Sequence, residues 1–319
     1  MISFENIKNV PKIDLHINFL SSVSESLLYS MDKDTNYDDM LSMNTLKLND
    51  YDKCLELPVK LLNNEKNVRK ALRDLIERLS SSSVMYGEIY LDLPLYNKKI
   101  PAEYLVNIAL DEIAKSNMQL KLALCASDTL EKEENLDLIR IYHEYKDKGV
   151  AFIYFKKERI TNLGDYIYLF DKMIREDVPY VLSYDNKINN QSRDIYEHAY
   201  RIIYELGYVE REIISLAKTN NIMLMFSISK LINTYSNFSV YELIDELIEN
   251  NYLVSINSED MTILNTDIIN EYCLLVNNCD LKLLQIVKNT MNNIKSLNIS
   301  DNQKEELITF LKEKSNSML

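Results

Sequence analysis

The chain has 319 residues and a formal net charge of −13, and it contains no run of basic residues. Binding to nucleic acid depends on Lys and Arg neutralising phosphates, so this charge excludes nucleic acid as a partner. No apolar run reaches the ~18 residues of a transmembrane helix. The N-terminus also lacks the pattern of a signal peptide. We therefore expect no membrane association and a cytoplasmic location.

Four cysteines, Cys54, Cys125, Cys273 and Cys279, occur without a CxxC pair, and most lie inside apolar segments. We interpret them as reduced core residues rather than as metal ligands or a redox site. Hydrophobic residues make up 46% of the chain, which is enough for a large core. The length is usual for one α/β barrel, and we expect a single domain over residues 1–319.

Short β-rich runs alternate with longer helical patterns along the whole chain, as βα units of a parallel sheet do. The predicted strands span residues 13–19, 84–91, 120–126, 150–156, 180–185, 206–209, 222–228 and 253–257. Helices are predicted at 101–115, 131–148, 164–176, 192–204, 211–219 and 240–250. Eight strands with alternating helices predict a (β/α)8 barrel, the TIM-barrel form of the α/β class.

Extra helices are predicted at two places outside this alternation. A mostly helical insertion follows the first strand and runs to about residue 79. Three helical segments, 266–276, 281–297 and 301–314, close the chain. The sequence does not establish whether the insertion forms a lid over the barrel, nor does it indicate an oligomeric state.

The first strand ends in His16, with Asn18 two residues later. Residues i and i+2 of a strand face the same way, so these two side chains point together. In a parallel barrel the chemistry lies at the C-terminal ends of the strands. We therefore expect the candidate site at these ends.

Several segments around the strand ends form a consistent resemblance. Val10–Ser21 is similar to P-K-x-E-L-H-x-H-L-D-G, and Tyr86–Tyr90 to Y-x-E-x-R. Residues 120–126 with 145–151, then 255–260 and 265–272, resemble further motifs of the same family, the last two being S-I-N-T-D-D and T-x-x-x-E-Y. Together they run in register from about residue 10 to residue 290. On these motifs the chain is identified as a divergent member of the adenosine deaminase family, within the metal-dependent amidohydrolase superfamily.

The resemblance implies a barrel whose zinc ion activates water to displace an amine from a purine. The family positions for zinc ligands fall on four residues of this chain: His16, Asn18, Ser183 and Glu259. Its catalytic positions fall on Asn186, Tyr208 and Asp260. Its substrate-binding positions fall on Asn18, Tyr184, Asp185 and Asp260.

Most of these residues are unsuited to the family's chemistry. One histidine and one carboxylate do not make a catalytic zinc site, and the amide of Asn186 cannot accept and return a proton. We therefore expect no zinc or other cofactor and no deaminase activity. The expected role is a non-catalytic or regulatory protein with a possible purine nucleoside or other small ligand. The alternative is an active purine deaminase or related hydrolase with an atypical metal site.

Three further groups of residues have more than one interpretation. Glu259, Asp260 and Asp185 form a carboxylate site suited to magnesium or calcium, or they are solvated loop residues. Lys156 and Lys157 pair with those acids and fill the pocket, or they are surface charges. The tyrosines Tyr90, Tyr154, Tyr184 and Tyr208 line a stacking pocket for a planar ligand, or they fill space left by a lost metal.

Overall fold

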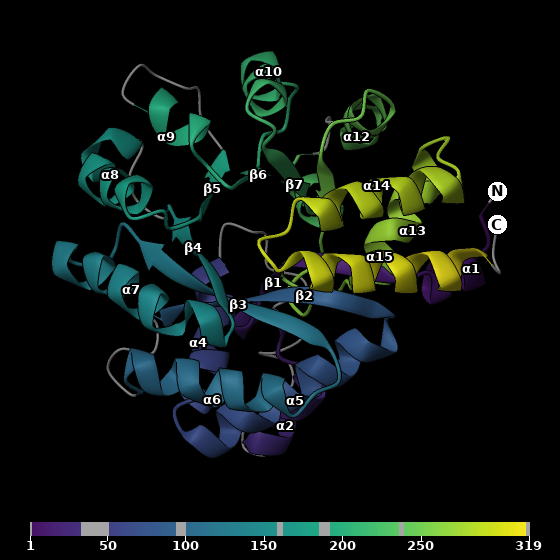
Figure 1. Cartoon of the computed structure of the whole chain (residues 1–319). Helices are drawn as coiled ribbons and strands as arrows, with labels where there is room; N and C mark the ends of the chain where they lie inside the picture. The colour runs from purple at the N-terminus through teal and green to yellow at the C-terminus, as the bar shows by residue number, and fades with distance from the viewer. Residues whose placement is uncertain are drawn as a thin grey trace.

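Eight parallel strands in the order β1 to β8 form the centre of the molecule (Figure 1). The computed structural model describes residues 2–32, 51–93, 100–157, 162–184, 192–235 and 239–316. The strands are β1 Lys12–Asn18, β2 Val84–Leu91, β3 Gln119–Ser127, β4 Val150–Lys156, β5 Tyr180–Tyr184, β6 Arg201–Tyr204, β7 Met223–Phe226 and β8 Val254–Ile256. Glu259, just after β8, meets β1: its N–H donates to His16 O at 2.8 Å, and its carbonyl accepts from Asn18 N at 3.0 Å. These bonds bring the first and last strands together, and the predicted TIM barrel is confirmed.

Helices surround the strands on the outside (Figure 1). In the first half of the chain they are α1 Phe4–Asn9, α2 Glu25–Met31, α4 Tyr51–Leu61, α5 Glu65–Ser81, α6 Ala102–Ala114 and α7 Lys132–Tyr145. The second half contains α8 Ile167–Arg175, α9 Arg193–Glu197, α10 Arg211–Thr219, α11 Ile228–Thr234, α12 Val240–Glu249, α13 Ile268–Asn278, α14 Leu283–Lys295 and α15 Asp301–Asn316. The extra helices predicted after the first strand and at the C-terminus are confirmed. None of the described helices is long and apolar enough to cross a membrane.

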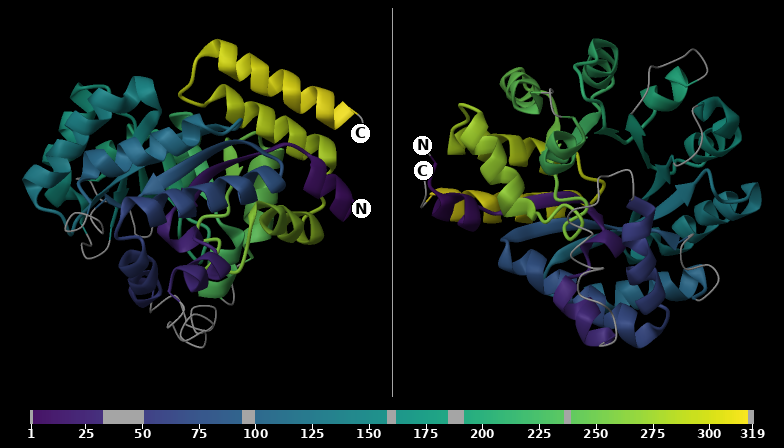
Figure 2. Two further views of the ribbon diagram at one scale, coloured as in Figure 1. Left: turned by 90° about the horizontal axis from the view of Figure 1, so that it is seen from below. Right: turned by 180° about the vertical axis from the view of Figure 1, so that it is seen from behind.

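The two groups of extra helices lie at opposite ends of the barrel. Figure 2 shows α2 and α4 on the side away from α15. Leu297, Leu307 and Leu311, from α15 and the end of α14, pack with Val10 and Ile13 in the apolar cluster at the start of β1. The C-terminal helices therefore close the N-terminal end of the barrel and leave the other end to α2 and α4.

The sixth predicted strand is wrong. Residues 206–209 lie in a loop, and β6 is Arg201–Tyr204, inside the predicted helix 192–204. The helix there, α9, ends at Glu197. Ile202, Ile203 and Tyr204 are residues that strands favour. Arg201 obscured this pattern because a charged residue is not expected inside a barrel.

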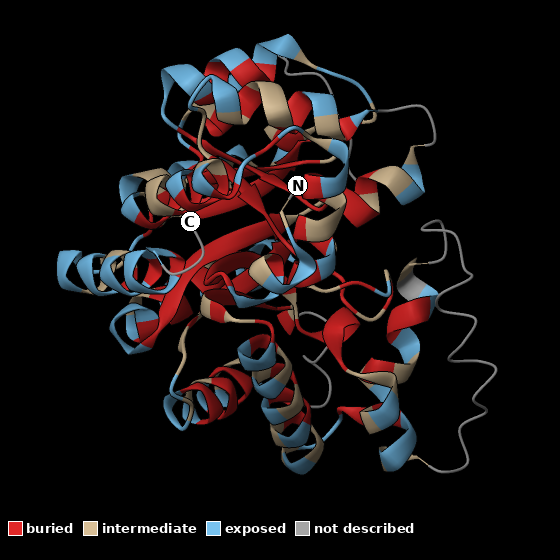
Figure 3. Cartoon of the chain, turned by 90° about the vertical axis from the view of Figure 1, so that its right-hand side faces the viewer, coloured by how far each residue is buried: buried red, intermediate tan, exposed pale blue. Residues whose placement is uncertain are grey.

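The core has two layers that follow the alternation of side chains along each strand. In β4, Phe152 and Tyr154 belong to the cluster inside the barrel, whereas Ile153 and Phe155 pack outward against the helices. Figure 3 shows the result: the strands are mostly buried, and the exposed residues of the helices lie mainly on their outer faces. Strands that are covered on both faces consist of nearly continuous apolar residues, which explains the apolar runs in the sequence.

A buried ion pair crosses the interior of the barrel. Both Arg201 on β6 and Glu88 on β2 are at most 1% exposed. Arg201 donates to both carboxylate oxygens of Glu88, with Nη2 at 3.1 Å from Oε1, and Tyr86 OH donates to the same Oε1 at 2.9 Å. The charges are therefore paired and bonded, as a buried pair must be.

The substitution Arg201→Met leaves the Glu88 carboxylate buried without its counter-charge. We expect it to lower the free energy of unfolding by about 3–5 kcal/mol, measured by urea denaturation. The matched control is Arg211→Met, which breaks the exposed pair with Glu246 and should change the free energy of unfolding far less, because water screens exposed ion pairs. Equal losses in the two variants would contradict this account.

Candidate functional site

A pocket of about 310 Å³ opens at the C-terminal ends of the strands. Asn18 ends β1, Lys156 ends β4, and Glu205 and Glu259 follow β6 and β8. Tyr51 and Leu55 of α4 also line it, so the insertion after β1 contributes to the pocket wall. This is the end of a TIM barrel at which active sites are built.

Asp260 is held by three donors from separate segments. Its Oδ1 accepts from Asn18 Nδ2 at 2.7 Å, Ser21 Oγ at 2.5 Å and Tyr51 OH at 2.9 Å. Its Oδ2 is buried and has no hydrogen-bond partner among the residues described. The carboxylate is therefore fixed in orientation and keeps one acceptor atom for another molecule.

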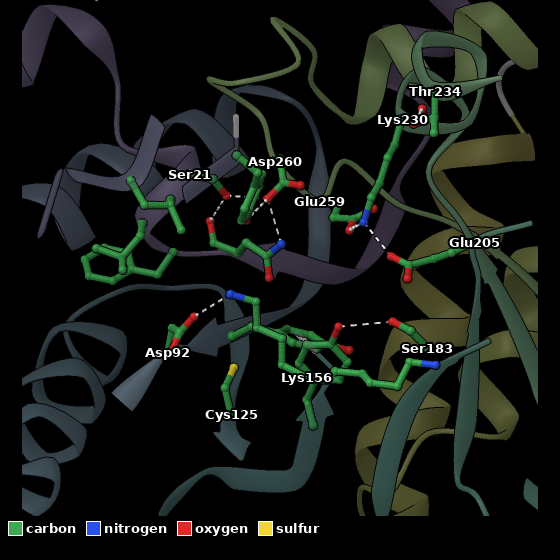
Figure 4. A pocket seen from close by; sticks show the side chains of 18 of the residues that line it. Ser21, Asp92, Cys125, Lys156, Ser183, Glu205, Lys230, Thr234, Glu259 and Asp260 are labelled. Carbon is green, nitrogen blue, oxygen red and sulfur yellow. Dashed lines mark hydrogen bonds and ion pairs between the residues drawn. The ribbon is translucent and has the colours of Figure 1, made fainter. Parts of the chain in front are cut away.

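Lys230 of α11 reaches between two carboxylates that come from different strand ends (Figure 4). Its Nζ lies 2.5 Å from Glu205 Oε1 and 2.5 Å from Glu259 Oε1. The second oxygen of Glu259 is buried and lacks a partner within the described part of the chain. One ammonium thus connects the ends of β6 and β8.

Lys230, Glu205 and Glu259 influence one another's pKa values. Burial acts to lower the pKa of Lys230, but Glu205 and Glu259 outweigh it and hold this pKa well above its usual value. Burial acts to raise the pKa of Glu205, but the Lys230 ammonium has the larger effect, so this pKa is lowered. For Glu259, burial prevails and the pKa is raised. Lys230 is therefore a permanent cation, balanced by an ionised Glu205 and an easily protonated Glu259.

The position of Lys230 depends on a contact from α13. Glu271 Oε2 accepts from Ile228 N at 2.7 Å and from Ser229 N at 3.2 Å, at the first turn of α11. Its Oε1 accepts from Thr266 Oγ1 at 2.8 Å. Buried side-chain acceptors of this kind satisfy the free N–H groups at a helix start. Glu271, part of the T-x-x-x-E-Y resemblance, thus anchors the helix that carries Lys230.

His16 lies beneath the pocket among aromatic rings. Its ring centroid is 4.3 Å from that of Tyr90 and 5.8 Å from that of Tyr154. Its Nδ1 is 4.0 Å from Glu259 Oε1, while the buried Nε2 has no partner in the described ranges. Burial and the nearby Lys230 lower the pKa of His16 to about 4, so the imidazole is neutral near pH 7.

Glu259 adopts an uncommon backbone conformation, with φ of 55°. A non-glycine residue in this left-handed region is strained by about 1–3 kcal/mol, and the conformation persists only where the surrounding structure fixes it. The two backbone bonds between Glu259 and β1 hold it here. The turn directs the Glu259 carboxylate toward Lys230 while the next residue, Asp260, faces Asn18.

The structure brings together only some of the predicted site residues. Asn18, Ser183, Glu259 and Asp260 line the pocket, with His16 below them. Tyr208 is 47% exposed and does not line it. Tyr184 is buried outside the barrel, its ring 5.3 Å from that of Tyr196. Asp185 and Asn186 lie outside the described residues.

The structure also decides between several of the open interpretations. Lys156 pairs with Asp92 at 3.2 Å, and among the described residues the lysine that binds Glu259 is Lys230. Of the four tyrosines, Tyr90 and Tyr154 pack together, with ring centroids 5.2 Å apart, and Tyr184 and Tyr208 lie elsewhere. No group of three His, Cys, Asp or Glu side chains in the described ranges is arranged to hold a metal ion.

Lys230 and Glu205 were missed by the sequence analysis, although both carried a signal. Glu205 directly follows β6 and was missed because that strand was placed too late in the chain. Lys230 comes four residues after the end of β7. A lysine so close to a strand end is at the right place for a site residue.

The four family positions for zinc ligands do not fit a zinc ion. Zinc needs imidazole, thiolate or carboxylate ligands that converge on one point. Here the Asn18 amide donates to Asp260, and the Ser183 hydroxyl bonds Tyr154 OH at 3.1 Å. The Glu259 carboxylate already contacts an ammonium.

A pocket lined by several charged side chains at the C-terminal ends of eight parallel strands defines the class as a TIM barrel with its candidate site at the usual end. A family model described as adenosine deaminase matches residues 30–314. The chain therefore belongs to the adenosine deaminase family.

Individual relatives agree with this assignment. The adenosine deaminase of Clostridium kluyveri is 22% identical over 323 residues, covering 91% of this chain and 90% of that protein. The Arabidopsis N6-mAMP deaminase has a TM-score of 0.85 at 17% identity, covering 97% of this chain and 99% of that chain. Arabidopsis ADAL complexed with IMP has a TM-score of 0.86 at 17% identity, covering 99% of this chain and 100% of that chain. At these identities the solved structures show the shared fold.

The raised pKa of Glu271 predicts how the stability of the folded chain depends on pH. Burial raises its pKa to about 7 from a usual value of 4.5. Between these values the native protein retains a proton that the unfolded chain releases, so stability falls as the pH rises from 4.5 to 7. Over this range the ionisation of Glu271 lowers the free energy of unfolding by up to about 3 kcal/mol.

In Glu271→Gln, which keeps an acceptor for the α11 N–H groups, we expect the part of the decline that Glu271 contributes to be lost from urea-unfolding curves recorded across that pH range. The raised pKa values of Asp14 and Glu259 keep the rest of the decline. The control is Glu246→Gln, an exposed glutamate paired with Arg211, which should keep the slope of the unmodified protein. A slope unchanged by Glu271→Gln would show that Glu271 ionises normally in the folded chain.

Proposed function

We propose that this chain is a non-catalytic member of the adenosine deaminase family that holds no zinc and binds a small purine ligand. The observation that carries the proposal is the state of Glu259, the one carboxylate at a family zinc position. Its Oε1 lies 2.5 Å from the Lys230 ammonium. A dication beside this ammonium would be repelled by it.

The loss of the proton shuttle supports the same proposal independently. The position of the family's catalytic glutamate falls on Asn186. An amide nitrogen does not take a proton from water and return it. A residual zinc ion would therefore lack the group that moves protons between water, ring nitrogen and leaving amine.

The pocket retains features suited to a ligand with hydrogen-bond donors. Asp260 Oδ2 and Glu259 Oε2 are buried acceptors without partners among the described residues. Unmet buried acceptors favour a ligand that donates to them. Small-ligand sites combine an apolar wall with a few such fixed polar groups. A purine fits this chemistry, since the relatives are named as adenosine and N6-mAMP deaminases and ADAL is complexed with IMP.

A cytoplasmic location is part of the proposal. The four cysteines all lie in the described ranges, and no disulfide joins any two of them. Free thiols are the usual state of cysteines in a reducing compartment.

Two measurements test the proposal together. The first is a deamination assay with adenosine, adenine and AMP, for which we expect no turnover. The second is the melting temperature with adenosine, inosine, AMP or IMP, for which at least one ligand should raise it. A ligand at a hundredfold excess over its Kd stabilises the folded chain by about 2.7 kcal/mol, a shift of several degrees.

The variant Asp260→Asn should abolish or greatly reduce the ligand shift, because the buried acceptor is replaced by an amide. The control Asp111→Asn changes a half-exposed aspartate on α6, outside the pocket, and should keep the full shift. Turnover of any of the substrates by the unmodified chain would contradict the loss of catalysis. The absence of a shift with all four ligands would contradict purine binding.

A further inference from the structure

The position of Lys230 has a consequence beyond ligand binding. Its side chain is 24% exposed, and it contacts Glu259, whose side chain is 3% exposed. Glu205, which follows β6, has its Oε1 at the same distance of 2.5 Å from Lys230 Nζ. Carboxylate oxygens that converge on one point are also the ligands that divalent ions such as Mg²⁺, Ca²⁺ and Mn²⁺ take in proteins.

We propose that Lys230 is the built-in cation of this pocket and occupies the place that a divalent ion would otherwise take between Glu205 and Glu259. Removing the ammonium exposes a latent site for a divalent cation. This inference goes beyond the proposed function, because it concerns the charge balance of the empty pocket and holds whether or not a purine binds.

The charges around Lys230 support this role. Without the ammonium, the carboxylates of Glu205 and Glu259 would share a small buried region with Asp260. Unpaired charges in such a region are costly, and the cost falls if a cation replaces the missing one. A bound divalent cation restores the balance, in competition with protonation of Glu259, whose pKa is already raised by burial.

Additional donor atoms lie on residues next to this region. Glu259 Oε2 and His16 Nε2 are buried and without partners among the described residues, and His16 Nδ1 is 4.0 Å from Glu259 Oε1. Carboxylate, water and neutral imidazole are ligands that Mn²⁺ and similar ions accept. The space vacated by the lysine side chain admits the waters that would complete the coordination.

A second lysine in the same pocket provides a matched comparison. Lys156 pairs with Asp92 at 3.2 Å, and among the described residues it does not lie between Glu205 and Glu259 as Lys230 does. Its removal leaves the contacts of Lys230 with these two carboxylates in place. The proposal therefore assigns the latent cation site to Lys230 and not to pocket lysines in general.

The test uses the full chain with Lys230→Ala and measures Mn²⁺ binding by the loss of the free-ion signal in electron paramagnetic resonance. We expect the variant to bind one Mn²⁺ at least roughly tenfold more tightly than the unmodified chain. The melting temperature of the variant should rise on adding Mn²⁺, and that of the unmodified chain should not.

Two control variants localise the effect. Lys156→Ala should not gain Mn²⁺ affinity, and Lys230→Ala/Glu259→Gln should lose most of the gain. A folded Lys230→Ala variant that binds Mn²⁺ no better than the unmodified chain would overturn the proposal. So would an equal gain in Lys156→Ala.

A neutral triple variant covers the case in which Lys230→Ala does not fold. Lys230→Met/Glu205→Gln/Glu259→Gln removes the cation and both partner charges while keeping side chains of similar size. If Lys230 serves to balance charge, this variant folds and melts well above Lys230→Met alone. A triple variant as unstable as Lys230→Met would show that the lysine acts by packing, and would overturn the proposal.

Discussion

The contact of one ammonium with two carboxylates is the interaction on which the rest of the site depends. Lys230 Nζ lies 2.5 Å from an oxygen of both Glu205 and Glu259. Charges buried in this way are tolerated only when they are paired and bonded. Other contacts serve this arrangement: Glu271 holds the start of α11, and the turn at Glu259 is fixed to β1. The pocket thus owes its charge balance to the protein's own side chains.

The barrel around this pocket is that of the adenosine deaminase family, and within it Lys230, Glu205 and Glu259 form a group of ion pairs. The fold does not by itself determine the function, because a barrel supplies strand ends and the residues placed there decide the chemistry. Asn18 and Asp260 still face each other, and His16 remains below them. Asn18 and Ser183 now serve as hydrogen-bonding groups, which is compatible with binding a small molecule.

The fold could be predicted from the sequence because the alternation of apolar strands and helices extends over the whole chain. The one misplaced strand, β6, carries Arg201, and a buried arginine cannot be recognised without knowing that Glu88 lies across the barrel. Tyr208, which the family resemblance places at a catalytic position, is 47% exposed, whereas Glu205 at the end of β6 lines the pocket.

The position of Asn18 at the end of the first strand could be predicted because the apolar run before it and the motif around it are both visible in the sequence. The role of Lys230 could not, since it depends on two carboxylates that are 25 and 29 residues away in the chain. Pairwise contacts between strand ends follow from the closed barrel, and a linear pattern does not encode them.

The most direct test of the central claim is a crystal of the unmodified protein soaked in zinc, with anomalous diffraction recorded at the zinc absorption edge. The account predicts no anomalous peak in the pocket and continuous density for Lys230 reaching between Glu205 and Glu259. A strong peak between His16 and Glu259, with the lysine displaced, would contradict it and indicate a metal centre of atypical composition.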